Sequence, residues 1–400
     1  MNKRIVNFVK YSKVVYSLYF YIGSFLLRLA RYFVKTDEKL IVFVSFGGRK
    51  FDDSPRCIYE KMIEDLRFTG YRLVWGFMEP QKFDIPVGGK VKIDTIKYYL
   101  LLLKARCWIT NSSVERGLSF SGKNTFYLNT WHGSAIKKMG RDIVDNNQSF
   151  GTKSNESYLN AMLAQGEYDI EVFSRSFNIP PEKFHLIGLP RNDELVAKGS
   201  FPSIRNKVCK YLGILADKHI ILFAPTFREY SKDAIGNRTI DLPINVSKWR
   251  EQLSDNSVVL FRAHYEVTKS LKVEDDFFWK DVSAYENLNE LMIASDMLIS
   301  DYSSIFFDYS IMEKPMLCYA YDYDLYQQQR GLYFDIRKEL ACQSISNEDE
   351  LLTQIANTDM SKASAVTIYF RNKYIGSYGE ATTKTIQLIC HSIMGKGDCM

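Results

Sequence analysis

The chain has 400 residues, well above the usual size of one compact domain, so its length predicts two domains. Hydrophobic residues make up 46% and charged residues 25%, which argues against intrinsic disorder and against a polytopic membrane protein. The net charge of +5 comes from the first 35 residues, which hold seven Lys or Arg and no acidic residue. The other 365 residues carry 45 basic and 47 acidic side chains, so no nucleic-acid partner is expected.

Residues 1–35 form a basic leader. Its longest uncharged run, between Lys13 and Arg28, has 14 residues, fewer than the about 20 that a spanning helix needs. On a helical wheel, six of the seven basic residues fall within an arc of about 80°, beside aromatic and aliphatic residues. We expect a helix that lies in an anionic membrane interface and holds the protein peripherally at the cytoplasmic face of the cell membrane. The alternatives are a helix packed on the protein body and a cleaved or spanning segment.

Seven cysteines are scattered along the chain, and the closest two are nine positions apart. No CxxC motif is therefore available for a zinc or redox site. An odd, scattered set fits reduced cytosolic thiols better than a disulfide framework.

Short apolar runs alternate with helix-like stretches over the rest of the chain. The runs lie at 40–46, 71–77, 107–110, 125–131, 161–165, 184–189, 219–227, 258–265, 296–300 and 315–320. Buried runs spaced by helices indicate parallel sheets in α/β layers. We expect two Rossmann-like domains that face a central cleft, at 36–200 and 201–400, with helices over 350–357 and 363–394.

Several common motifs are missing. There is no GxGxxG, no GxxxxGK[ST] and no GxSxG, which disfavours a nicotinamide dehydrogenase, a P-loop enzyme and a serine hydrolase. An Asp-Tyr-Asp triplet at 322–324 leaves open a metal-dependent nucleotide-sugar transferase as a minor alternative. We expect neither a metal nor a cofactor.

Ligands of parallel sheets bind at the carboxyl ends of the strands, so the polar residues directly after the apolar runs are the candidates. Five clusters lie there, at 131–142, 189–193, 224–229, 262–265 and 301–308. Ser303 and Ser304 at a helix start suit a phosphate, although a plain helix cap explains them as well. Arg262 and His264 alternate along a strand and would meet a pyrophosphate, unless His264 is a core histidine.

Six segments together resemble the CDP-glycerol glycerophosphotransferase family of teichoic acid synthesis. They are FGGRKFDDSPRCIYE (46–60), TWHGSAIKKMG (130–140), GLPRND (188–193), FAPTFRE (223–229), FRAHY (261–265) and ASDMLISDYSSIFFDY (294–309). The resemblance spans residues 40–335 and implies a GT-B-like fold. It also implies transfer of a polyol phosphate from CDP-glycerol or CDP-ribitol to a lipid-linked glycan or polyol-phosphate acceptor of a wall or capsule polymer, with release of CMP.

The resemblance also assigns roles to residues at matching positions. The CDP-polyol site would contain Trp131, Gly133, Ser134, Ala135, Arg191, Pro225, Thr226, Arg262, Ala263, Ser303, Ser304 and Asp308. Ser134-Ala135 replaces the family's usual Thr-Pro, and the usual Gly-rich segment is absent after 331–342, which leaves the polyol open.

The chemistry of this transfer suggests separate roles for two histidines and a basic segment. His132 ends a strand of the first domain, and we expect it to be the general base. His264 would stabilise charge on the pyrophosphate. Lys137, Lys138 and Arg141, at what reads as a basic helix start, would hold an anionic acceptor, although a solvated helix face explains them nearly as well. The alternatives are a GT-B glycosyltransferase that uses a nucleotide sugar and a non-catalytic scaffold of wall or capsule assembly.

Overall fold

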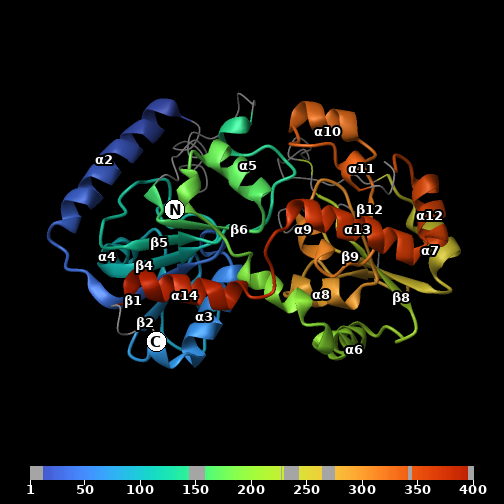
Figure 1. Ribbon diagram of the computed structural model, residues 1–400, viewed down its shortest axis with the longest axis horizontal. Helices are drawn as coiled ribbons and strands as arrows, with labels where there is room; N and C mark the ends of the chain where they lie inside the picture. Colours follow the sequence, from blue (N-terminus) through green and yellow to red (C-terminus); the bar gives the residue numbers. More distant parts are fainter. Residues whose placement is uncertain are drawn as a thin grey trace. The chain divides into compact units, whose positions relative to one another are not determined.

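The computed structural model describes residues 12–143, 158–226, 228, 243–263, 275–340 and 345–394. Over these ranges the chain forms two α/β units (Figure 1). Unit 1 contains the chain up to His132, residues 139–193 and the C-terminal part from Gly376. Unit 2 contains residues 133–138 and 194–375.

Unit 1 is built on a seven-stranded parallel sheet with the strand order β3-β2-β1-β4-β5-β6-β7. The strands are β1 Asp37–Val44, β2 Arg72–Phe77, β3 Gly89–Lys92, β4 Ala105–Thr110, β5 Phe126–Asn129, β6 Ala161–Ala164 and β7 Phe184–Leu186. The helices in its described part are α2 Lys13–Arg31, α3 Asp53–Glu64, α4 Ile96–Lys104, α5 Glu167–Phe177 and α14 Ala381–Ile393.

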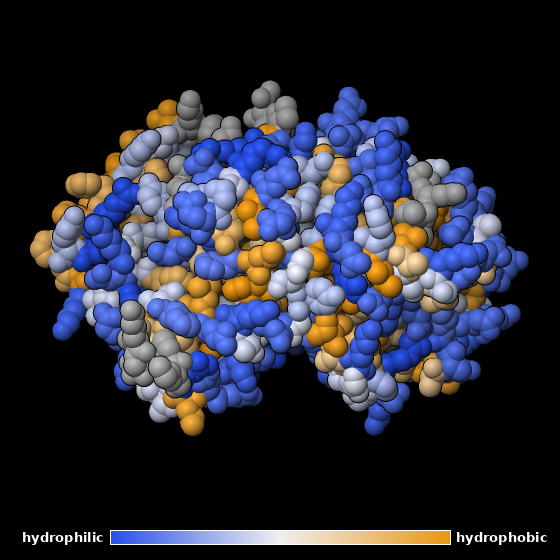
Figure 2. Space-filling model, in the orientation of Figure 1, coloured by the Kyte–Doolittle hydropathy of each residue, from blue (hydrophilic) through white to orange (hydrophobic). Residues whose placement is uncertain are grey.

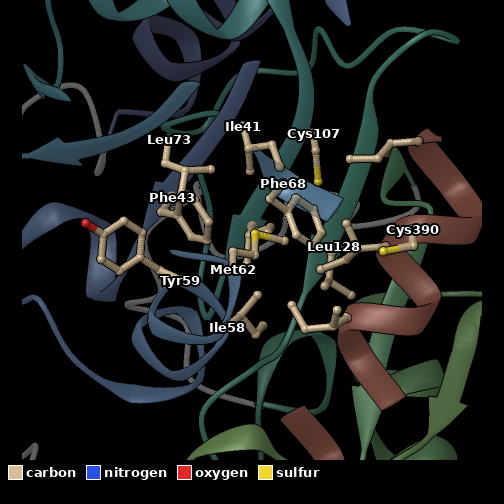
Figure 3. Close-up of a cluster of buried hydrophobic side chains, with 14 of the residues drawn as sticks. Ile41, Phe43, Ile58, Tyr59, Met62, Phe68, Leu73, Cys107, Leu128 and Cys390 are labelled. Carbon is tan, nitrogen blue, oxygen red and sulfur yellow. The ribbon is translucent and has the colours of Figure 1, made fainter. Parts of the chain in front are cut away.

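One face of this sheet packs against α3 and α14 (Figure 3). Ile41 and Phe43 are two residues apart on β1 and therefore point to the same face. The buried residues labelled in the figure are Ile41, Phe43, Ile58, Tyr59, Met62, Phe68, Leu73, Cys107, Leu128 and Cys390. This packing fixes α3, which begins beside the candidate site described below.

The C-terminal helix belongs to unit 1, although it follows unit 2 in the sequence. The Asp193 carboxylate caps α14 by accepting hydrogen bonds from the backbone N–H groups of Ala381 (2.9 Å) and Thr382 (2.7 Å). The predicted division at residue 200 placed this helix in the second domain. The structure instead divides the chain at residue 193 and returns residues from Gly376 to unit 1.

Unit 2 has a five-stranded parallel sheet with the strand order β10-β9-β8-β11-β12. Its strands are β8 His219–Phe223, β9 Ser257–Phe261, β10 Trp279–Asp281, β11 Met297–Ser300 and β12 Met316–Cys318. Its described helices are α6 Phe201–Leu212, α7 Val246–Leu253, α8 Leu288–Ala294, α9 Ile305–Ser310, α10 Tyr323–Gln329, α11 Ile336–Glu339, α12 Glu348–Asn357 and α13 Met360–Tyr374.

The two parallel-sheet units confirm the predicted α/β architecture. Every predicted apolar run overlaps a strand, and the predicted C-terminal helical region forms α12, α13 and α14, with a break between α13 and α14. Strands β3 and β10 were not predicted from the sequence. These edge strands have four and three residues and carry lysine or aspartate, so they lack the apolar run that marks a buried strand.

Helix α2 packs closely on residues 115–125 of unit 1. The Ser24 hydroxyl accepts a hydrogen bond from the backbone N–H of Ser119 at 2.9 Å. A side chain at Gly23 would bring its Cβ within 2.9 Å of the Leu118 Cδ2 atom, so a glycine permits this approach. Of the predicted leader, Lys13–Arg31 is helical, while residues 1–11 lie outside the described part of the chain.

Two arginines of the predicted basic stripe bind the protein body. Arg28 donates from Nε to the Ser119 carbonyl and from Nη2 to the Ser119 hydroxyl, both at 2.8 Å. Arg31 donates from Nη1 to the Thr125 hydroxyl at 3.1 Å. These two arginines therefore face the protein body, whereas the stripe was predicted to face a membrane. A helical wheel shows which residues share a face, but it does not show what that face contacts.

The opposite face of α2 is apolar and exposed. Its residues are Val14, Leu18, Tyr21, Ile22, Phe25, Leu26 and Leu29. Figure 2 shows hydrophobic side chains along the rim that α2 occupies in Figure 1. In the ranges that the structure describes, no helix has both the length and the hydropathy needed to cross a bilayer.

A buried glutamate lies under α2. Glu115 is 7% exposed, and its Oε1 accepts hydrogen bonds from the backbone N–H groups of Phe120 (2.6 Å) and Ser121 (2.9 Å). Burial raises the pKa of Glu115 to about 7, against the opposing effect of these bonds and of Arg28 and Arg31. Between pH 4.5 and 7 the folded protein therefore retains a proton that the unfolded chain has lost, and stability falls as pH rises through this window.

The Glu115→Gln variant is expected to lose this pH dependence, because glutamine keeps an acceptor oxygen but does not titrate. The wild type should lose at most about 3 kcal/mol between the two pKa values, and the variant should lose none of this contribution. Urea unfolding of both proteins at pH 4.5, 5.5 and 7.5 measures the difference. An exposed-site control, Glu64→Gln, should keep the wild-type slope, and an unchanged slope in Glu115→Gln would show that Glu115 does not titrate in this range.

Candidate active site

His132 lies in a tight turn after β5 of unit 1. Trp131 has a left-handed backbone (φ 53°), and Gly133 also has positive φ (133°). The Trp131 ring packs on the His132 ring, with centroids 4.3 Å apart, and on the Phe173 and Phe177 rings of α5, at 5.6 and 4.7 Å. Trp131, predicted to touch the CDP-polyol, therefore also fixes the position of the imidazole.

The hydrogen bond of the imidazole identifies its tautomer. His132 Nδ1 lies 2.6 Å from the Asn111 carbonyl oxygen at the end of β4. A carbonyl oxygen only accepts, so Nδ1 carries the proton and Nε2 of the neutral ring is unprotonated. Burial lowers the pKa of His132 below its usual 6.5, and Arg191 adds to this, while the Asn111 bond and the Asp53 charge oppose it. His132 is therefore neutral at pH 7, with Nε2 able to accept a proton.

Arg191 and Asp53 form a buried ion pair next to His132. Arg191 Nη1 donates to Asp53 Oδ2 at 2.7 Å and also to the His132 carbonyl oxygen at 3.0 Å. Arg191 follows β7, and Asp53 begins α3 with left-handed backbone (φ 66°). Arg191 was predicted to lie in the substrate site, and in the structure its Nη1 has two protein acceptors.

These residues share the carboxyl edge of the unit 1 sheet. Phe46 follows β1, Asn111 follows β4, His132 follows β5 and Arg191 follows β7. Phe46 and His132 have ring centroids 5.6 Å apart. Three non-glycine residues of this group have positive φ, namely Phe46, Asp53 and Trp131. Such strained conformations concentrate at functional sites.

The candidate loops of unit 2 are joined by Arg228. Its Nη1 donates to Asp301 Oδ2 at 2.9 Å and to the Thr226 carbonyl at 2.7 Å, while its Nε donates to Asp322 Oδ2 at 2.6 Å. Asp301 Oδ1 accepts the Thr226 N–H at 2.8 Å. Thr226 and its buried neighbour Pro225 are thus held next to the loop that follows β11.

The Asp-Tyr-Asp triplet has a structural role. Asp322 binds Arg228 and also accepts a hydrogen bond from the Tyr302 hydroxyl at 3.1 Å, whereas Asp324 is exposed. No group of three potential metal ligands occurs among the residues that the structure describes. Within the triplet, Asp322 is therefore accounted for by its bonds to Arg228 and Tyr302.

Arg262 and Ala263 directly follow β9. Arg262 Nη1 donates to the carbonyl oxygens of Val282 (3.1 Å) and Tyr285 (2.7 Å), and the Ala263 N–H donates to the Ser283 hydroxyl at 2.9 Å. His264 lies outside the described residues. Binding of a pyrophosphate by Arg262 and His264 stays a prediction.

Ser303 and Ser304 lie between β11 and α9, as expected. Ser303 Oγ accepts the Ile305 N–H at 3.3 Å, whereas the Ser304 side chain makes no capping bond. Ser303 thus makes a weak local bond of the kind that the plain-cap alternative requires. Asp308 is buried on α9.

The segment after His132 is extended and not helical. Lys137 pairs with Leu332 in an isolated antiparallel bridge, and the Lys138 N–H donates to the Gly331 carbonyl at 3.0 Å. Ser134 and Ala135 are buried in the same segment, and Arg141 lies in a short 3₁₀ turn at Gly140–Asp142. The predicted helix start is therefore wrong, because backbone pairing with residues 331–333 keeps the segment extended. Acceptor binding by Lys137, Lys138 and Arg141 stays a prediction.

Comparison with known proteins assigns the family. The sequence profile of the CDP-glycerol:poly(glycerophosphate) glycerophosphotransferases matches residues 26–390. The chain belongs to this family. The predicted family, the GT-B-like fold and the enzyme class, a transferase, are thereby confirmed.

Similar proteins cover most of the chain. It is 31% identical over 370 residues to the teichoic acid glycerol-phosphate transferase of Staphylococcus aureus, which covers 88% of this chain and 93% of that one. It is 32% identical over 334 residues to the teichoic acid poly(glycerol phosphate) polymerase of Staphylococcus epidermidis, covering 80% of this chain but 46% of that longer protein. A histidine variant of the wall teichoic acid polymerase TagF, soaked with CDPG, has a similar structure (TM-score 0.81, 29% identity, 92% of both chains).

Proposed function

We propose that the protein transfers glycerol phosphate from CDP-glycerol to a membrane-linked acceptor in teichoic acid or capsule synthesis and releases CMP. The observation that carries this proposal is the unprotonated Nε2 of His132 at the carboxyl edge of the sheet, in a chain of this family. The similar proteins support glycerol as the polyol, since their names specify glycerol phosphate.

The proposed reaction is one displacement at phosphorus. The acceptor hydroxyl attacks the phosphorus atom that carries glycerol, and His132 Nε2 takes the hydroxyl proton. The bond from this phosphorus to the bridging oxygen breaks, and CMP leaves with that oxygen. Unit 2 would hold the pyrophosphate through Arg262, His264, Ser303 and Ser304, where serine hydroxyls and a cationic arginine suit a phosphate.

The donor can be tested directly. Purified protein is incubated with a lipid-linked acceptor and CDP-glycerol, CDP-ribitol or a UDP-sugar, and the released nucleotide is measured. The proposal expects CMP from CDP-glycerol at the highest rate. Preferred turnover of a UDP-sugar would instead support a glycosyltransferase, and failure to bind any cytidine nucleotide by calorimetry would support a scaffold.

Peripheral attachment at the cytoplasmic face of the membrane is the second part of the proposal. The exposed apolar face of α2 supports it, because such a face lowers its free energy when it enters the headgroup boundary of a bilayer. The two described arginines on α2 bind the protein, so apolar burial would provide most of this helix's contribution. The free cysteines of the described ranges fit a reducing compartment.

Replacing three exposed residues of this face by serine is expected to weaken vesicle binding about tenfold or more, because each loses much of its apolar area. Suitable positions are Ile22, Phe25 and Leu29, which are 55%, 64% and 45% exposed. A control replaces three apolar residues elsewhere that are more exposed, Leu66 (87%), Tyr211 (75%) and Leu215 (67%), by serine. Cosedimentation with phosphatidylglycerol-containing vesicles measures the effect, and unchanged binding of the α2 variant would place the anchor elsewhere.

A further inference from the structure

Asp53 is a buried carboxylate to which the proposed reaction gives no role. It is 8% exposed and stands in the strained left-handed conformation at the first position of α3. Its Oδ1 accepts the Ser54 N–H at 2.7 Å, and its Oδ2 accepts Arg191 Nη1 at 2.7 Å. Burying a charged carboxylate costs free energy unless its partners compensate for the lost water, so the partners of Asp53 bear on its role.

Asp53 is linked to His132, the proposed base, through a single nitrogen atom of Arg191. Arg191 Nη1 bonds both the Asp53 carboxylate and the His132 carbonyl oxygen. The backbone N–H of Arg191 also donates to the Ser54 hydroxyl at 3.3 Å. The start of α3 and the turn that carries the imidazole are thus joined by a single guanidinium.

We propose that Asp53 is a positioning residue for His132: it holds Arg191 against the turn of His132, and its charge stabilises the imidazolium that forms when the base takes a proton. This inference rests on the proposed function, in which His132 Nε2 is the base. Ring orientation is supplied separately, by the Asn111 carbonyl and the Trp131 ring.

The electrostatics require a negative partner here. Proton uptake by His132 places a positive charge near the guanidinium of Arg191, which is unfavourable unless another charge compensates it. Asp53 and Arg191 are the charged groups that act on the ring, and the other groups described around it, from Asn111, Phe46 and Trp131, are uncharged. The two charges act in opposite directions, since Asp53 raises the pKa of His132 and Arg191 lowers it.

This opposition gives a test that a purely structural role would not satisfy. The titration midpoint of the His132 ring is measured by NMR in the full chain with labelled histidine, and the resonance is assigned with His132→Gln. Asp53→Asn should move the midpoint to lower pH, and Arg191→Gln should move it to higher pH. The double variant, which leaves no unpaired charge, should lie between them. Equal midpoints in folded variants, or shifts of the same sign, would overturn the proposal.

Turnover provides the second readout. Asp53→Asn should lower kcat for CMP release about tenfold or more, with little change in KM for CDP-glycerol, because the imidazolium that forms in the chemical step loses its stabilising charge. Asp65→Asn, which breaks an Asp–Arg pair at the other end of α3, serves as the control and should leave both values unchanged. If Asp53→Asn does not fold, Arg191→Gln and the double variant supply the same comparison.

The two proposals fail in different ways. A wild-type protein that does not use CDP-glycerol contradicts the proposed function, while the NMR midpoints still test the effect of Asp53 on His132. A wild-type protein that uses CDP-glycerol, with unmoved midpoints in the variants, contradicts only the role of Asp53.

Discussion

The His132→Ala variant is expected to lose turnover by about 10²–10⁴-fold, the usual contribution of general base catalysis. Its affinity for CDP-glycerol should change little, because the residues proposed to bind the pyrophosphate belong to unit 2. Steady-state CMP release and calorimetry with CDP-glycerol measure the two quantities separately.

Two other histidines serve as comparisons. His391, exposed on α14 with its Nδ1 near the Gln387 carbonyl, is the control, and His391→Ala should keep wild-type turnover. His264→Ala should lose both binding and turnover, since His264 is predicted to contact the pyrophosphate. Near-normal turnover of His132→Ala at pH 7–8 would remove it from the role of base.

The pH dependence of turnover also tests the assignment of His132 as the base, because the direction of the change can be predicted. The base works only when Nε2 is unprotonated, so kcat/KM, which reports the ionisation of the free enzyme, should fall on the acidic side as His132 gains a proton. Because burial lowers the pKa of His132, this fall should begin below the usual value of 6.5.

The Arg228→Leu variant is expected to lower the free energy of unfolding by about 3–5 kcal/mol, the usual cost of removing one partner from a buried ion pair. Arg228 is 4% exposed, and its loss leaves the Asp301 and Asp322 carboxylates facing each other without a cation. Three tyrosine rings stand within 5.3 Å of the guanidinium carbon, so water has little access to the pair.

Urea unfolding of the full chain measures this loss. Arg72→Leu, which removes the more exposed ion pair with Asp37, is the matched control and should cost less than about 1 kcal/mol. Adding Asp301→Asn and Asp322→Asn to Arg228→Leu should recover part of the stability, because amides do not repel each other. Equal losses in Arg228→Leu and Arg72→Leu would show that the buried network does not stabilise unit 2.

The sequence alone predicted most of the fold because each buried parallel strand can be recognised from a short apolar run between two helices. It did not predict that α14 returns to unit 1, since the capping of Ala381 and Thr382 by Asp193 joins residues almost 190 positions apart. It also did not predict which side of α2 faces the body. That depends on Arg28 and Arg31 finding acceptors in residues 115–125.

The candidate site was predicted in part. His132 and Arg191 were found because each follows a strand, where ligands of such sheets bind. Asp53 was missed, although Asp-Asp-Ser-Pro at 52–55 is a typical helix start, because a helix cap explains two aspartates there. Its bond to Arg191 joins residues 138 positions apart, which no local pattern reveals.

The most direct test of the proposed reaction is the mass of the product together with the identity of the nucleotide released. The purified protein is incubated with CDP-glycerol and a lipid-linked acceptor, and both are measured by mass spectrometry. Transfer of glycerol phosphate predicts an acceptor heavier by glycerol phosphate units, with one CMP released for each unit added. Release of CDP together with addition of glycerol alone would contradict the proposed reaction. An acceptor whose mass stays unchanged, even when membranes are added to the assay, would contradict it as well.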